Sequence, residues 1–116
     1  MKKIQIQIPS NERRLEEAFL LFVEEEFNTK GEFKQEKISE EIRKDLSIAE
    51  VAWNILQFYA TIEGSLQFSE RLARVERVKK LLNSIEEVGK SVYIKIGETD
   101  VLDLLGMSVD DLMDIL

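Results

Sequence analysis

The chain lacks two residue types altogether, because none of its 116 residues is cysteine or histidine. Without cysteine there are no disulfides, thiolate nucleophiles, zinc knuckles or iron–sulfur clusters. Without histidine there is no Ser-His-Asp triad, no histidine-ligated metal and no imidazole switch near neutral pH. Most familiar catalytic chemistry is thereby removed. We expect a protein that is not an enzyme and that has neither a cofactor nor a metal site.

Long apolar runs and clustered glycines are also missing. No stretch approaches the roughly 18 apolar residues of a membrane span, and residues 4–9 alternate instead of forming the apolar run of a signal peptide. Proline occurs once, and the five glycines stand singly, so none builds a phosphate-binding loop. The sequence therefore predicts a cytoplasmic protein that does not enter a membrane. A length of 116 residues, 44% of them hydrophobic, fits one small domain.

Apolar periodicity predicts an α+β fold that is predominantly helical. Isoleucine alternates with polar residues over 3–8, and residues 92–96 alternate again, which predicts two short strands. We expect these strands to pair with each other or to extend a sheet across a dimer. They bracket four main helices, which we expect to end near Phe27, to cover 38–46, to run from Ile48 to about Ile62, and to run from 65–69 to Gly89. A short helical tail then gives the order β-α-α-α-α-β-α-α.

Local capping signals place the helix boundaries. Ser10 is suited to cap the first helix, and Leu20 and Leu21 widen its apolar stripe, so we expect this helix to be buried on more than one side. Ser47 and Glu50 form a capping box that starts the third helix. That helix is the most apolar segment, which assigns it to the centre of the core. In the tail, Thr99 is expected to cap a helix over 101–105, and Ser108 with Asp111 forms a second box.

Acidic residues are concentrated at the end of the chain. The 23 acids and 16 bases give a net charge of −7, and residues 98–116 contain six acids and no base. The chain therefore divides into a domain at 1–97 and an acidic amphipathic tail at 98–116. The tail is either part of the same fold or an arm that lies in a groove of a dimer mate or another protein. The candidate partner-binding residues are Val101, Leu102, Asp103, Leu105, Asp110 and Leu112.

A basic ladder lies on the fourth predicted helix. Arg71, Arg74 and Arg77 recur every three residues, so they could contact phosphate groups or the acidic tail. The alternative is a solvated helix face in which Glu70 pairs with Arg74. The net negative charge of the chain counts against binding to nucleic acid. Adjacent acids such as Asp110 and Asp111 leave carboxylate catalysis open, but neighbours on a helix do not face each other.

These features predict a non-enzymatic protein–protein interaction or assembly module. We expect it to work as a homo-oligomer, most simply a dimer, through its acidic tail and its edge strands. One alternative is a nucleic-acid-associated regulator in which the arginine ladder contacts phosphate and the tail competes for it. Another is a small accessory or inhibitor protein of a virus or mobile element, an idea that rests on small size, acidity and the absence of catalytic chemistry.

Overall fold

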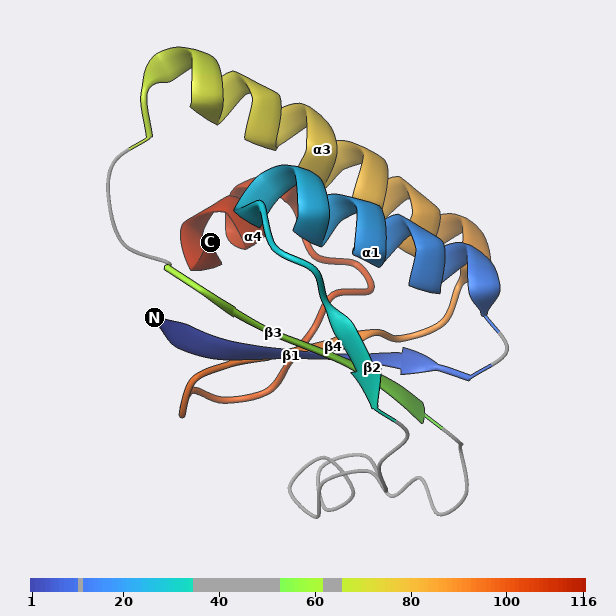
Figure 1. The fold of residues 1–116 in the computed structure, drawn as a ribbon. Coiled ribbons are helices and arrows are strands. Elements are labelled where there is room, and N and C mark those ends of the chain that lie inside the picture. The colour runs from blue at the N-terminus through green and yellow to red at the C-terminus, as the bar shows by residue number, and fades with distance from the viewer. Residues whose placement is uncertain (11, 35–52, 62–65) are drawn as a thin grey trace.

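The computed structural model describes residues 1–10, 12–34, 53–61 and 66–116. These residues form an α+β fold with five strands and three helices, in which the strands make one layer and the helices the other (Figure 1). The strands are β1 (Lys2–Pro9), β2 (Glu32–Lys34), β3 (Trp53–Ala60), β4 (Tyr93–Ile96) and β5 (Leu102–Asp103). The helices are α1 (Arg13–Phe27), α3 (Phe68–Val88) and α4 (Val109–Ile115). Within the described residues, no helix has the length and apolar character that crossing a membrane requires.

The five strands form a single antiparallel sheet in the order β2-β3-β1-β4-β5. Strand β2 is therefore parallel to β1 with β3 between them, and β4 is parallel to β3 with β1 between them. Helix α1 follows β1 and leads to β2, while α3 follows β3 and leads to β4. The two β-α-β units are thus interleaved, which is the split β-α-β, or ferredoxin-like, topology. Strand β5 and helix α4 are added after it.

The central strand β1 supplies the middle of the core. Ile4, Ile6 and Ile8 are all buried, because successive side chains of a strand alternate between the two faces of the sheet. They join apolar residues of α1 and α3 in one cluster, and Figure 1 shows all three helices on the same face of the sheet. The predicted strands at 3–8 and 92–96 are confirmed, and β1 pairs with β4 over residues 4–7.

Both long helices end as the sequence predicts. Helix α1 stops at Phe27 because Asn28 adopts a left-handed conformation with φ 52°. Helix α3 stops before Gly89, whose φ of 72° lies in the left-handed region that glycine adopts without steric cost. The predicted cap at Ser10 is wrong. The N-cap residue is Glu12, because the chain first turns through a backbone hydrogen bond from the Glu12 N–H to the Pro9 carbonyl.

The predicted third helix is wrong over the residues that the structure describes. Residues 53–60 form β3, which pairs with β1 along its whole length. Both Ile55 and its neighbour Leu56 are buried, although they point to opposite faces of the sheet. A strand buried on both faces reads as a continuous apolar run and cannot be told from a buried helix by periodicity. The predicted helix at 38–46 and the capping box at Ser47 lie outside the described residues.

The tail also departs from the expected pair of helices. Residues 102–103 form β5, and Thr99 donates its hydroxyl to the Ile96 carbonyl in the turn before it. The second capping box is confirmed, since the Ser108 hydroxyl accepts a hydrogen bond from the Asp111 N–H at 3.1 Å and α4 begins there. The fold is therefore not four main helices bracketed by two strands. It is a five-stranded antiparallel sheet with its described helices on one face.

The tail completes the same core as the rest of the chain. Leu104 and Leu112 belong to the cluster that contains the β1 isoleucines, and α4 packs against α3. Leu112 is 2% exposed. We expect Leu112→Ala to lower the free energy of unfolding by about 2–5 kcal/mol, because it leaves a cavity in this core. Urea unfolding measures the change.

The matched control for this prediction is Asp114→Ala, an exposed position in the same helix. We expect it to change the free energy of unfolding by no more than about 0.5 kcal/mol. Equal effects of the two substitutions would mean that α4 contributes little to the core.

Candidate functional site

Helices α1 and α3 form the outer layer of the molecule and run antiparallel, side by side (Figure 1). Ion pairs join them at both ends. Arg14 near the start of α1 binds Glu87 near the end of α3, and Glu26 near the end of α1 binds Arg74 in α3. The Arg14 pair is exposed and contributes little stability. The Glu26 pair is shielded from water, so removing one partner would leave the other charge shielded and unpaired at that end.

The shielded cluster has one carboxylate and two guanidinium groups. The side chain of Glu26 is 4% exposed, and that of Arg74 is 11% exposed. A second guanidinium, that of Arg77, donates from Nη1 to the other Glu26 oxygen at 2.9 Å. The Arg74 guanidinium also lies over the Phe27 ring, 5.8 Å from its centroid, where the negative ring face attracts a cation. The carboxylate therefore has two partners that offset part of its desolvation cost.

This cluster accounts for two members of the predicted arginine ladder. Arg74 and Arg77 are both bound to Glu26 of α1, and the Arg77 Nε lies 3.6 Å from Glu25. Among the described residues, the ion-pair partner of Arg74 is Glu26 rather than Glu70. Arg71 is exposed. The three arginines thus do not project together as one free basic row, because α1 supplies carboxylates to two of them.

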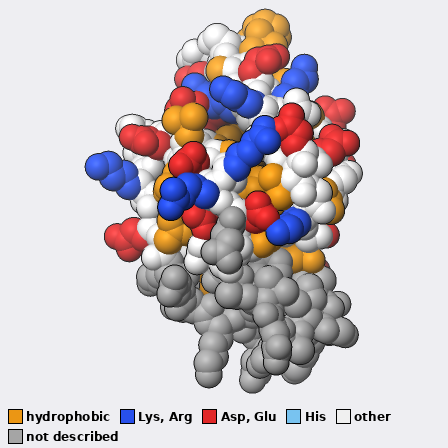
Figure 2. Space-filling view, turned by 90° about the vertical axis from the view of Figure 1, so that its right-hand side faces the viewer, with side chains coloured by type: hydrophobic (Ala, Val, Ile, Leu, Met, Phe, Trp, Pro, Cys, Tyr) orange, Lys and Arg blue, Asp and Glu red, His pale blue; other side chains and the backbone are white. Residues whose placement is uncertain are grey.

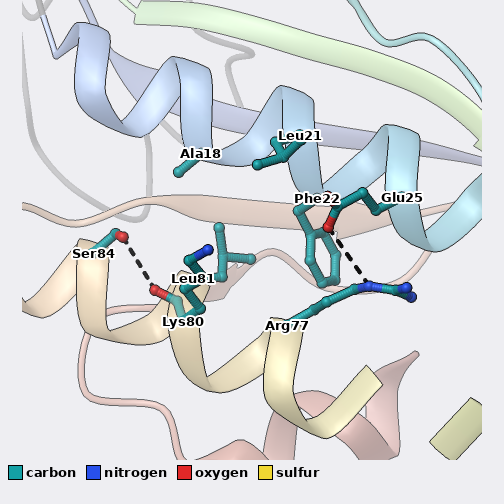
Figure 3. Close-up of a pocket in the computed structure, with 8 residues that line it drawn as sticks. All are labelled: Ala18, Leu21, Phe22, Glu25, Arg77, Lys80, Leu81 and Ser84. Atoms are coloured by element: carbon teal, nitrogen blue, oxygen red, sulfur yellow. Dashed lines mark hydrogen bonds and ion pairs between the residues drawn. The ribbon is translucent and has the colours of Figure 1, made fainter. Parts of the chain in front are cut away.

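A groove lies between the two helices, inside the span that the ion pairs define. It has a volume of about 400 Å³ including its open mouth. Small side chains leave this space, since Ala18 of α1 and Ser84 of α3 both line it. The buried residues Phe22 and Leu81 form an apolar floor, and Figure 3 shows them pointing into the gap between the helices. Leu21 stands at the edge and is 49% exposed.

Charged side chains with opposite signs on the two helices border this floor, namely Glu25 on α1 and Arg77 and Lys80 on α3. Further charges lie on the exposed parts of the same helices. The exposed acids Glu17 and Glu24 lie on α1, whereas Lys79 and Lys80 lie on α3. Lys79 is 3.8 Å from Glu76 within its own helix. In the part of the chain that the structure describes, Glu17, Glu24 and Lys80 take part in no ion pair. Figure 2, which shows the molecule from the right-hand side of Figure 1, also has acidic and basic side chains interspersed among small apolar patches.

The six predicted partner-binding residues of the tail are dispersed. Leu112 is buried in the chain's own core, and Leu105 is partly buried against it. The Asp103 carboxylate is used internally, because it accepts hydrogen bonds from the Ser91 hydroxyl at 2.8 Å and the Leu105 N–H at 2.9 Å. The remaining three do not share the core: Val101 is half-buried, and Leu102 and Asp110 are exposed.

Sequence reasoning did not find the groove. It assigned Leu21 to a widened buried stripe, but Leu21 is half exposed while Phe22 beside it is buried. The available signal was the position of Leu21, which is offset from the buried series Leu15, Phe19 and Val23. Within the described residues, no group of three or more acidic side chains is arranged to hold a metal ion. What the groove can do chemically is accept an apolar side chain within a charged frame.

Comparisons with protein-family models, with curated proteins and with solved structures gave no match. Because a fold topology by itself does not assign a function, the function has to be argued from the groove and its surroundings.

We expect Glu26→Ala to lower the free energy of unfolding by about 3–5 kcal/mol, because it leaves Arg74 shielded from water without its carboxylate. Urea unfolding measures the change. Glu25→Ala is the control, since this neighbouring carboxylate is half exposed and its removal should cost about 1 kcal/mol or less. Similar losses for the two variants would contradict the assignment of Glu26 as the main link between the helices.

Proposed function

We propose that the chain is a non-enzymatic protein–protein interaction module that associates with itself, and that its docking surface is the groove between α1 and α3. The observation that carries this proposal is the combination of an apolar floor with the exposed Leu21 at its edge. A groove between helices that has apolar walls and a polar rim is one of the general ways in which proteins bind a helix of a partner.

The energetics of such a surface favour binding through a few apolar contacts. Burying apolar area contributes about 25 cal/mol per Å², and interface energy is concentrated in central side chains that lose contact with water. Leu21 is the large apolar side chain beside the groove that has most of this area left to bury. The surrounding charges act mainly on partner choice and on the rate of association.

The groove supports this function better than the tail or the sheet edges do. Leu104 and Leu112 are committed to the chain's own core, so the tail has fewer apolar side chains to offer. The edge strands β2 and β5 have three and two residues, and short edge strands disfavour pairing with another chain. The arginine ladder supports nucleic-acid binding weakly, because two of its three guanidinium groups already bind carboxylates.

Self-association is tested by the mass in solution. We expect light scattering over a series of concentrations to give a mass that rises from the chain mass of 13.5 kDa toward twice that value. The rise should persist at high salt, because salt screens exposed charges but does not weaken apolar burial. A mass of 13.5 kDa at every concentration that stays in solution would reject self-association.

A further inference from the structure

The α1–α3 face carries a projecting apolar side chain and an apolar hollow next to each other. Leu21 is half exposed, and the groove floor of Phe22 and Leu81 begins directly beside it. Leu21 cannot fill the groove of its own chain, because it stands at the border of that groove. A surface of this kind fits a copy of itself across a two-fold axis, since each copy then offers one projection and one hollow.

The charges on this face are also complementary to those of a second copy. The exposed face of α1 carries the acids Glu17 and Glu24, and that of α3 carries Lys79 and Lys80 beside one acid, Glu76. A two-fold axis that runs along the groove, between the two packed faces, places α1 of one copy over α3 of the other. Acidic side chains of α1 then meet basic ones of α3 twice in the dimer.

We propose that two copies of the chain pack these faces together about a two-fold axis, with Leu21 of each copy inserted in the groove of the other. This proposal rests on the proposed function and names the partner and the packing at its site. Glu17 and Glu24 of each copy lie near Lys79 and Lys80 of the other. The small side chains of Ala18 and Ser84 provide the space that the incoming leucine occupies.

The absence of native cysteine provides a direct test, because an introduced thiol is unique in the chain. One chain carries Leu21→Cys, and a second chain, enlarged by a tag, carries Ser84→Cys. We expect mild oxidation of the mixture to give the mixed disulfide dimer. The control replaces the first chain by one that carries Leu72→Cys, a similarly exposed position near the start of α3 and outside the groove lining. Its mixture should give several-fold less mixed dimer.

A second measurement uses substitution instead of cross-linking. Leu21→Glu should raise the dissociation constant of the dimer roughly tenfold or more, since the variant loses the remaining apolar burial of Leu21 and also brings a carboxylate against the apolar floor. Leu72→Glu, the matched control, should leave the constant nearly unchanged. Circular dichroism of both variants shows that they are folded.

The outcomes separate the packing proposal from the proposed function. If the native chain is a dimer but the two leucine positions behave alike in both experiments, the dimer forms elsewhere and the packing proposal is overturned, while self-association stands. If the native chain is monomeric at every concentration, self-association itself is rejected, and the packing falls with it. Selective cross-linking through position 21 together with selective loss of affinity supports both.

Discussion

Pairing of β1 on both of its sides is the constraint on which the rest of the structure depends. One side of β1 is paired with β3 over eight residues, and the other side with β4 over residues 4–7. Two neighbours that come from the middle and the late part of the chain are thereby joined to its first segment. Because Ile4, Ile6 and Ile8 share one face, that face has to be covered, and α1 and α3 lie there side by side.

The contact between α1 and α3 follows from this arrangement and creates the surface to which we assign a function. The shielded carboxylate of Glu26 binds two arginines of α3, which holds one end of the helix pair. A shielded ion pair adds little net stability compared with an apolar contact, but losing one partner is costly, so it specifies how the helices lie. Farther along, Ala18 and Ser84 are too small to close the gap. The hollow is thus a consequence of small residues at two positions of the helix pair.

Several elements could be predicted from local pattern because their apolar residues recur with the period of a strand or of a helix. This holds for the strands around residues 3–8 and 92–96, for the two long helices, and for the helix start at Ser108. Strand β3 could not be predicted in this way. It lies between β1 and β2 and is buried at residues 55 and 56 on both faces, so its alternation is hidden. Its β-branched and aromatic residues, Trp53, Ile55, Phe58 and Tyr59, were the local indication of a strand.

The candidate site was less accessible to sequence reasoning than the fold. An exposed leucine and a buried one look alike in a periodic pattern, so Leu21 was assigned to the core. The arginines were recognised, but their partner Glu26 lies 48 residues from Arg74 in the chain, and no local pattern reports such a contact. By itself, the sequence determined the absence of cysteine and histidine chemistry, the acidic tail and the elements with a regular apolar period, because these depend on composition and on neighbouring residues. Only the tertiary structure decided which apolar residues stay exposed and which charges are paired, because both depend on contacts between segments that are distant in the chain.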